Sequence, residues 1–290
     1  MLDKSVPHNA VDVLDRIVSH QVVRPTNRIP VRLIYPADTF SPKIADEVFA
    51  DEFAAAQAAE LPVSIFNFED FQGGTFRPRP AIQSGETVLY RGWMLTPTEY
   101  TRLFEAIVAA GGTPITDVAA YTLCHHLPRW YPLLTEFTAE TMTFSETDDI
   151  AAALAAHGWD GCFLKDYVKS LSTDGGSVVR DLSAIPAVIT KMLKYRGQIE
   201  GGLCARRLED YNTSSERRYF VWRGQAHSDT GEVPQVVAET ASRVSSPFFS
   251  VDVARRSDGV LRVIELGDGQ VSDRKNWDCH NFISMLSFGA

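Results

Sequence analysis

The sequence predicts an α/β chain in two parts. In the first part, residues 1–144, three strand patterns alternate with helical patterns, an order that builds a parallel sheet covered by helices. In the second part, residues 145–290, an α+β arrangement is expected. Residues 248–269 there contain two runs of alternating β-formers around Asp258-Gly259, a dipeptide typical of a hairpin turn.

Composition places the chain among ordinary globular proteins. Of its 290 residues, 44% are hydrophobic and 22% are charged, which leaves enough apolar residues for a sizeable core. The formal net charge of −9 argues against a protein that binds nucleic acids or anionic membranes through its overall charge. The substrate is therefore expected to be a small molecule or a peptide.

Cysteines and the first residues bear on the cellular compartment. The four cysteines lie far apart and form no C-x-x-C pair, so we interpret them as reduced thiols and predict neither a zinc site nor a disulfide framework. They are Cys124, Cys162, Cys204 and Cys279. The start of the chain lacks a secretory signal, and no run of about 18 apolar residues occurs. A cytoplasmic location is expected.

Helical and strand patterns can be placed along the first part of the chain. Thr96 and Pro97 together are typical of a helix N-terminus. We predict helices at residues 10–20, 44–59 and 97–110, strands at 31–35, 63–68 and 87–91, a short strand-like segment at 113–118, and a loop at 73–80.

Arg91 follows the third predicted strand, in the sequence Arg91-Gly92-Trp93. Ligand-facing residues of parallel sheets lie just beyond the carboxyl ends of the strands, which makes Arg91 a candidate for contacting an anion. Two structural alternatives stay open: an arginine stacked on Trp93, or one that is ion-paired at the strand end.

Residues 124–132 are rich in aromatic residues and prolines, and we predict a loop there. The segment contains two adjacent histidines, His125 and His126. Neighbouring residues on a regular strand point in opposite directions and would not face one ion. A metal-binding role is therefore not predicted for this pair.

Lysines and a polar loop suggest a phosphate site in the second part. Residues 162–169 are predicted to form a strand, on which Lys165 and Lys169 point to the same side. The next residues, 170–177, form a loop of glycines and hydroxyl side chains that can fold over phosphates. The combination indicates a polyphosphate, although a surface strand that enters a hairpin would look similar.

The remaining patterns give antiparallel strands and three helices. Arg218 lies two residues beyond Glu216 and shares its face, which allows either an ion pair or a phosphate clamp. We predict helices at residues 147–157, 184–196 and 233–244, a pair of antiparallel strands at 203–209 and 216–225, and a closing segment through 288.

The predicted hairpin brings two acids together. If Asp258 and Gly259 form a two-residue turn, Asp252 lies directly opposite Glu265 on one face. The apolar pairs on the other face are Val251 with Leu266 and Val253 with Ile264. Opposed like charges repel, so a Mg²⁺ ion held by both carboxylates, or an exposed face with arginines nearby, should compensate them.

This register has one defect. It sets Arg255 against Arg262 near the tip of the hairpin, which again opposes like charges. A longer loop that moves the register by a residue or two therefore stays open.

Taken together, five motifs in this order and spacing resemble the ATP-grasp superfamily, and most closely its clade named for one arginine and two lysines. The resemblance spans roughly residues 145–275. The motifs are Phe163-Leu164-Lys165, the loop at 170–177, Glu216-x-Arg218-Tyr219, Ser250-Val251-Asp252, and the run from Val263-Ile264-Glu265 to Ser272.

The resemblance implies an ATP-grasp fold with an N-terminal pre-ATP-grasp α/β domain. That first domain would occupy residues 1–144 and the ATP-grasp domain residues 145–290. The small lobe would lie at about 145–205 and the large lobe at about 206–290, with ATP between them.

The resemblance also implies a reaction. Members of the superfamily join a carboxylate to an amine through an acyl-phosphate and release ADP and phosphate, using ATP and Mg²⁺. The partners would be small-molecule or peptide carboxylates and amines, with no nucleic acid and no membrane. A small-molecule kinase and a non-catalytic nucleotide-binding protein are the alternatives. The oligomeric state stays open, with a homodimer among the candidates.

Individual roles follow from the resemblance. Relatives often have Asn two residues after the metal-binding glutamate, but this chain has Gly267, which leaves Asp268 or Gln270 as the third metal ligand. The implied metal ligands are Asp252, Glu265 and Asp268, and the implied catalytic residues are Arg218, Lys169 and Arg91. The implied nucleotide contacts are Lys165, Lys169, Ser172, Gly175, Gly176, Ser177, Arg206, Arg207, Leu208, Glu209 and Arg218.

Overall fold

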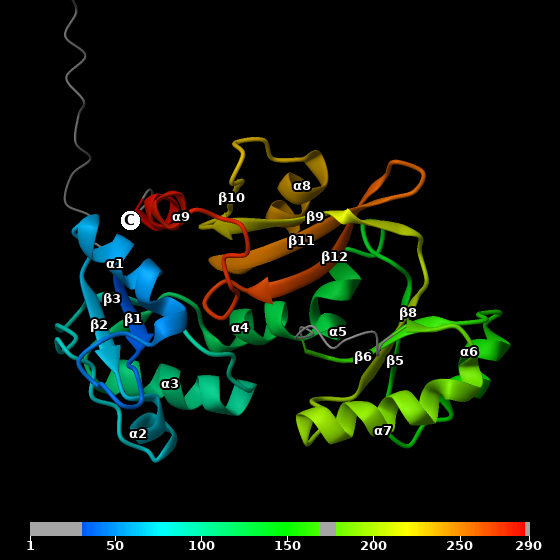
Figure 1. The fold of residues 1–290 in the computed structure, drawn as a ribbon, viewed down its shortest axis with the longest axis horizontal. Helices are drawn as coiled ribbons and strands as arrows, with labels where there is room; N and C mark the ends of the chain where they lie inside the picture. The colour runs from blue at the N-terminus through cyan, green and yellow to red at the C-terminus, as the bar shows by residue number, and fades with distance from the viewer. Residues whose placement is uncertain (1–30, 169–177, 288–290) are drawn as a thin grey trace, which may run out of the picture.

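Within the residues that the structure describes, three four-stranded sheets organise the chain (Figure 1). The computed structural model describes residues 31–168 and 178–287. One sheet is formed by the first part of the chain, and the other two lie in the second part. The helix predicted at 10–20 and the loop predicted at 170–177 lie outside the described residues.

The N-terminal sheet is parallel throughout, as the alternating patterns predicted. Its strand order is β2-β1-β3-β4. β1 is buried along its whole length, which is typical of a parallel strand covered on both faces. The strands are β1 (Arg32–Pro36), β2 (Val63–Phe66), β3 (Thr87–Tyr90) and β4 (Thr113–Pro114).

Helices connect these strands near the predicted positions. α3 begins with a capping box, in which the Thr96 hydroxyl accepts from the Glu99 backbone N–H and the Glu99 carboxylate accepts from the Thr96 backbone N–H. The strand predicted at 63–68 ends at Phe66 because Asn67 caps a short helix. The helices are η1 (Glu47–Phe49), α1 (Ala50–Ala58), α2 (Phe68–Gln72) and α3 (Pro97–Ala109).

The prediction of a loop at residues 124–132 is wrong, because the chain there is helical. α4 (Val118–His125), α5 (Leu127–Trp130) and the 3-10 turn η2 (Tyr131–Leu133) follow one another. Asp117 caps α4, and prolines occupy the first turns of α5 and η2, where a missing N–H costs no hydrogen bond. Apolar side chains of this segment share a core with strands from residues 211–268, which form the third sheet described below. The segment therefore packs with the second part of the chain.

The second sheet, which we call the small sheet, is antiparallel with the order β5-β8-β6-β7. Sequence reasoning missed β5 (Thr141–Phe144), which joins this sheet ahead of the expected boundary at 145. The strand predicted at 162–169 ends at Asp166. The other strands are β6 (Cys162–Asp166), β7 (Val178–Val179) and β8 (Leu203–Arg207), and the helices are α6 (Ile150–Ala156), η3 (Leu182–Ala184) and α7 (Ile185–Arg196).

The third sheet, which we call the large sheet, has the order β10-β9-β11-β12. β8 and β9, predicted to be a pair of antiparallel strands, lie in different sheets and do not pair with each other, so residues 208–210 connect the two sheets. The strands are β9 (Tyr211–Trp222), β10 (Gln225–His227), β11 (Phe248–Arg256) and β12 (Leu261–Asp268), and the helices are α8 (Gln235–Arg243) and α9 (Cys279–Ser287).

The hairpin of β11 and β12 has the predicted register at its acidic pair and a different one near its tip. Asp252 pairs with Glu265, and Val251 with Leu266, as predicted. A bulge then shifts the register, so that Val253 pairs with Val263 instead of Ile264. The shift sets Arg255 opposite Leu261 and Ala254 opposite Arg262, which separates the two arginines. The loop is thus longer than two residues, with Gly259 at a φ of 90°.

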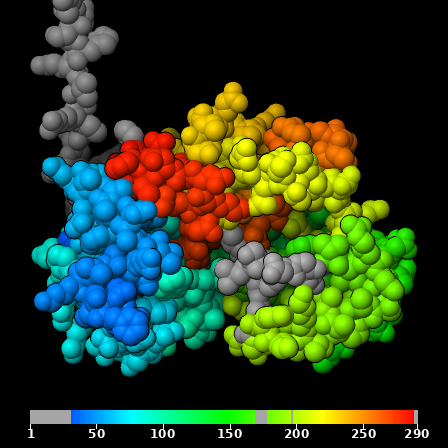
Figure 2. All heavy atoms as spheres, in the orientation of Figure 1, coloured from blue at the N-terminus to red at the C-terminus, as the bar shows by residue number. Residues whose placement is uncertain are grey.

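One core joins the large sheet to the N-terminal sheet. Phe220 and Phe248 of the large sheet contact Phe282 of α9, and these side chains share a cluster with Leu33 and Tyr35 of β1. Figure 2 shows α9, in red, lying against the N-terminal part, in blue. The end of the chain therefore fastens the two parts together. Among the described residues, no helix is both long and apolar enough to cross a bilayer.

Candidate functional site

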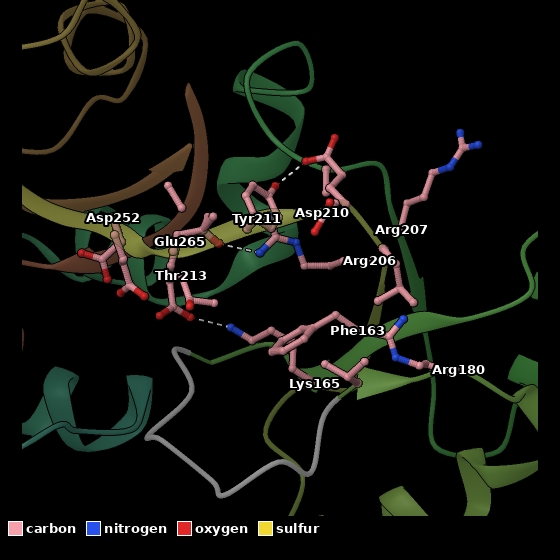
Figure 3. Close-up of a pocket in the computed structure, with 17 residues that line it drawn as sticks. Phe163, Lys165, Arg180, Arg206, Arg207, Asp210, Tyr211, Thr213, Asp252 and Glu265 are labelled. Carbon is pink, nitrogen blue, oxygen red and sulfur yellow. Dashed lines mark hydrogen bonds and ion pairs between the residues drawn. The ribbon is translucent and has the colours of Figure 1, made fainter. Parts of the chain in front are cut away.

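A cleft of about 490 Å³ lies between the small and the large sheet, a volume within the range of small-molecule sites (Figure 3). Phe163 and Val178 of the small sheet and Ile264 of the large sheet give it an apolar wall. Charged groups line the rest, among them Lys165, Asp252 and Glu265. The cleft can thus receive a flat apolar group at one place and an anion at another.

The segment between the two sheets borders the cleft. The residues that line the cleft include four of the implied nucleotide contacts, namely Arg206, Arg207, Leu208 and Glu209. Arg206 is buried and donates hydrogen bonds to the Ile264 carbonyl and to Thr138 Oγ1, which ties β8 to β12. Glu209 is held by Arg256, Arg262 and Tyr211. Burial is the main cause that raises the pKa of Tyr211 to about 12, and the hydrogen bond to the Glu209 carboxylate and its negative charge add to this rise.

Lys165 and Glu265 face each other across the cleft (Figure 3). Lys165 Nζ lies 2.7 Å from Glu265 Oε1, and the lysine side chain is only 4% exposed. β6 of the small sheet carries the lysine and β12 of the large sheet carries the glutamate. A cation from one sheet therefore neutralises an acid from the other.

Asp252 has a different cationic partner. Arg218 Nε lies 2.7 Å from Asp252 Oδ1 and Nη2 lies 2.6 Å from Oδ2, a two-pronged contact between cross-strand neighbours in β9 and β11. Burial alone would lower the pKa of Arg218, but its hydrogen bonds and charge attraction to Asp252 outweigh burial and raise it. The ion pair that the sequence allowed between Arg218 and Glu216 is thus replaced by one with Asp252, while Glu216 pairs with Lys275.

Sequence reasoning missed two residues beside this pair. Lys275 Nζ lies 3.4 Å from Asp252 Oδ2, and Asp273 Oδ1 accepts a hydrogen bond of 2.8 Å from Arg218 Nη1. Both lie in the segment between β12 and α9. The only signal available for them was a run of charged residues directly after the hairpin, from Asp273 to Lys275.

The chemistry of the acidic pair fits a hard divalent cation. Asp252 and Glu265 are opposed residues on adjacent antiparallel strands, so their side chains share one face. Carboxylate oxygens are the donors that Mg²⁺ prefers in proteins. Lys165, Arg218 and Lys275 neutralise the pair in this structure, which agrees with the expectation that two opposed acids need compensation.

Asp268 does not join the other two candidate metal ligands. Side chains alternate along β12, so Asp268 points to the face opposite Glu265, where it is fully buried. Its Oδ1 accepts hydrogen bonds from the backbone N–H and the side-chain amide of Gln270. Gln270 in turn donates to the Tyr100 hydroxyl, so neither candidate for the third ligand reaches the cleft.

Arg91 is buried and ion-paired, the second of its two structural alternatives. Its guanidinium contacts both carboxylate oxygens of Glu52, at 2.7 and 2.8 Å. It also donates to the carbonyls of Gly269 and Ser272 and lies over the ring of Phe282 instead of Trp93. At 1% exposure Arg91 fixes the segment after β12 to the N-terminal sheet and is closed to solvent.

Several predicted site residues lie outside the described part of the chain. They are Lys169, Ser172, Gly175, Gly176 and Ser177. Lys165, Arg218, Asp252, Glu265 and the segment from Arg206 to Glu209, in contrast, are all described. Of these, Arg218 lies beside the cleft through its contact with Asp252, and the others line it.

Comparison with protein families gives one match. The matching sequence model describes an ATP-grasp domain, family 3 of the clade named for one arginine and two lysines, and it covers residues 127–286, more than half of the chain. The matched region begins at α5, in agreement with the packing of that helix against the large sheet. A search of curated protein sequences found no match.

Solved structures with the same fold span nearly the whole chain. A RimK domain protein ATP-grasp from Sphaerobacter thermophilus aligns with a TM-score of 0.60 and 16% identity, covering 90% of this chain and 100% of its own. D-cycloserine synthetase DcsG has a TM-score of 0.61, 17% identity, and coverages of 89% and 98%. The D-alanine-D-alanine ligase from Coxiella burnetii has a TM-score of 0.57, 13% identity, and coverages of 89% and 94%.

Replacing Arg91 by Met should destabilise the fold. The change leaves the buried Glu52 carboxylate without its two-pronged partner, and breaking a buried pair in this way costs about 3–5 kcal/mol. Urea unfolding measures the loss. Arg243→Met, which breaks a surface pair, is the control and should cost less than about 1 kcal/mol. Adding Glu52→Gln to Arg91→Met should recover part of the loss, and equal losses in the single and double variants would contradict this account.

Asp268 should make stability fall as the pH rises. Burial raises its pKa to about 7, while hydrogen bonds from Gln270 and the charge of Arg91 offset only part of that rise. An unfolded aspartate ionises near pH 3.9, so between about pH 4 and 7 the folded state holds more protons than the unfolded state. The free energy of unfolding should then drop by up to about 1.4 kcal/mol per pH unit. Urea unfolding of Asp268→Asn across this range should lack that slope, and parallel curves would refute the assignment.

Proposed function

The chain belongs to the ATP-grasp superfamily, in its clade named for one arginine and two lysines, and on that premise we propose that it is an ATP-dependent carboxylate–amine ligase. The reaction would proceed through an acyl-phosphate and release ADP and phosphate. The observation that carries the proposal is the cleft in which Lys165, Asp252 and Glu265 converge from two sheets, with Arg218 beside it on Asp252. The family and fold support a ligase, and this constellation supports the chemistry.

The two ends of the cleft suit the two ends of ATP. Phe163, Val178 and Ile264 offer apolar surface to a flat base, beside the connecting segment at Leu208. Lys165 lies farther along the cleft, at the acidic pair, and would bind a phosphate oxygen. Lys165 would then exchange its present partner, Glu265, for a phosphate.

The acidic pair would hold Mg²⁺. Asp252 and Glu265 would supply carboxylate oxygens to the ion, which when bound would neutralise phosphate oxygens of ATP. Arg218 stays against Asp252 at the border of the cleft and would contact the transferred phosphoryl group from there. Asp273 holds that guanidinium from its other side.

These side chains would offset the charge that the reaction crowds together. In the first step a carboxylate oxygen of the substrate bonds to the γ-phosphorus while the bond from that phosphorus to ADP breaks. An amine then attacks the acyl carbon, and phosphate leaves. Fixed cations such as Lys165 and Arg218 stabilise the negative charge shared by the donor, the carboxylate and the leaving group.

The substrates are expected to be small molecules or peptides that carry a carboxylate and an amine. The structures with the same fold include a D-alanine-D-alanine ligase and a D-cycloserine synthetase, which makes amino-acid-derived substrates the first class to test. The N-terminal sheet packs against the large sheet through α9, so this sheet and the helices that connect its strands would serve as the pre-ATP-grasp domain.

The proposal is tested by incubating the protein with Mg²⁺ and ATP and pools of amino acids and dipeptides, and by measuring ADP and product mass. A ligase forms ADP only when both an acid and an amine are present, and the product mass equals their sum less one water. ADP formed without an amine, together with a phosphorylated product, would indicate a kinase instead. ATP binding without ADP formation in any pool would indicate a non-catalytic nucleotide-binding protein.

Lys165→Ala and Glu265→Ala should each remove ADP production. The first variant lacks the phosphate contact and the second lacks a metal ligand, so each loses an interaction that turnover needs, together with the Lys165–Glu265 ion pair. Lys194→Ala, an exposed lysine in α7, is the matched control and should keep full activity. Circular dichroism and thermal melting should show that the inactive variants fold. Unchanged turnover in either variant would overturn the site assignment.

A further inference from the structure

Two histidines and a glutamate converge outside the cleft's acidic pair. His125 is the last residue of α4, His126 follows it, and Glu200 precedes β8 in the small sheet. One donor atom from each residue lies within 4.8 Å of the other two. Adjacent histidines can do this because the chain leaves the helical conformation at His126, so the alternation expected for a strand does not apply.

Ordinary pairing accounts for only one of the two histidines. His126 Nε2 lies 3.0 Å from Glu200 Oε1, the distance of a hydrogen bond. His125 Nε2 lies 3.6 Å from the same oxygen, and it has no hydrogen-bond partner among residues 31–168 and 178–287. His125 is only 2% exposed, so water does not reach this nitrogen freely. Buried polar atoms normally have a bonding partner, and His125 Nε2, which lies near a carboxylate without bonding to it, lacks one.

The distances fit a cation placed between the three groups. Ligands at about 2.0–2.2 Å from a tetrahedral ion lie roughly 3.4 Å apart. The two measured separations, 3.0 and 3.6 Å, lie on either side of that value. Small side-chain movements would therefore bring all three donors to bonding distance.

We propose that His125, His126 and Glu200 bind a divalent transition metal of the zinc class. Two imidazole nitrogens and one carboxylate suit Zn²⁺ or Co²⁺, whereas Mg²⁺ prefers oxygen donors alone. The protein would thus hold two metals of different chemistry, a hard ion at Asp252 and Glu265 and a borderline ion at this second site. Three protein ligands leave one position of a tetrahedral ion for water or another ligand.

The surroundings hold both rings in place. The His125 ring stacks on Tyr121, with centroids 5.0 Å apart, and the His126 ring contacts Tyr167 edge-on. The backbone N–H of Leu127 also donates to the Tyr167 carbonyl at 2.8 Å. Rings fixed by packing lose little freedom when they bind an ion.

The site bridges two units of the fold. α4 packs with the large sheet, whereas Glu200 belongs to the chain entering β8 of the small sheet. Tyr167, which touches His126, lies two residues beyond Lys165. A bound ion would therefore fasten α4 to the small sheet, close to the strand that carries Lys165, and raise the melting temperature of the whole chain.

The test is binding of Zn²⁺ and Co²⁺ to the full chain, prepared with chelator and then kept in excess Mg²⁺ so that the carboxylate pair of the cleft is occupied. Calorimetry should show one Zn²⁺ per chain. Co²⁺ should give the visible absorption of a four-coordinate, nitrogen-ligated ion, which an all-oxygen site does not give. His126→Gln and Glu200→Gln should each weaken Zn²⁺ binding about 100-fold.

Controls separate this site from other ligands on the chain. His157→Gln removes a histidine that is also 2.9 Å from a glutamate, but at the surface and without a third donor, so binding should stay within about twofold. All variants keep the four cysteines, so a difference in Zn²⁺ affinity between variants does not come from cysteine ligands. A melting temperature raised by Zn²⁺ in the native chain and in His157→Gln, but not in Glu200→Gln, would complete the support.

Two results would overturn the proposal. The first is no Zn²⁺ binding to the native chain, or binding that His126→Gln and Glu200→Gln leave unchanged. The second is a loss of melting temperature in those variants without any metal dependence in the native chain. That second result would make the cluster an ion pair between α4 and the small sheet.

Discussion

The pairing of Asp252 with Glu265 is the constraint on which the site depends. Two acids directly opposed on adjacent strands repel each other, and that arrangement persists only with cations close by. Arg218 of the neighbouring strand compensates one acid, and Lys165 of the other sheet compensates the second. Lys165 and Glu265 thus hold the two sheets face to face, and in the proposed reaction these two side chains would exchange each other for a phosphate and a metal ion.

Buried polar contacts keep this region in register with the rest of the molecule. Arg91 binds Glu52 and the carbonyls of Gly269 and Ser272, which fixes the segment after β12 to the N-terminal sheet. That segment carries Asp273, which holds Arg218 from its far side. Arg91, which is closed to solvent, thus supports the geometry of the cleft without lining it. Its position after a strand is one that a ligand contact and a buried structural arginine can both occupy.

Sequence patterns located most of the regular structure, and they failed where the local signal was ambiguous. The parallel sheet and the helix start at Thr96 followed from alternation and helix-start residues. The helical segment around His125 was mistaken for a loop, because its aromatic residues and prolines hid helix starts at which proline is favoured. β8 and β9 were taken for a pair, since short-range patterns do not say which sheet a strand joins.

The sequence by itself determined the acidic pair, because the hairpin's alternation fixes which residues share a face near the middle of the strands. It also determined the order of motifs from which the family follows. Only the tertiary structure decided that Asp268 turns away into the core, that Arg91 is buried against Glu52, and that the histidines meet Glu200. Those outcomes depend on contacts between residues 39 to 181 positions apart, which no local spacing specifies.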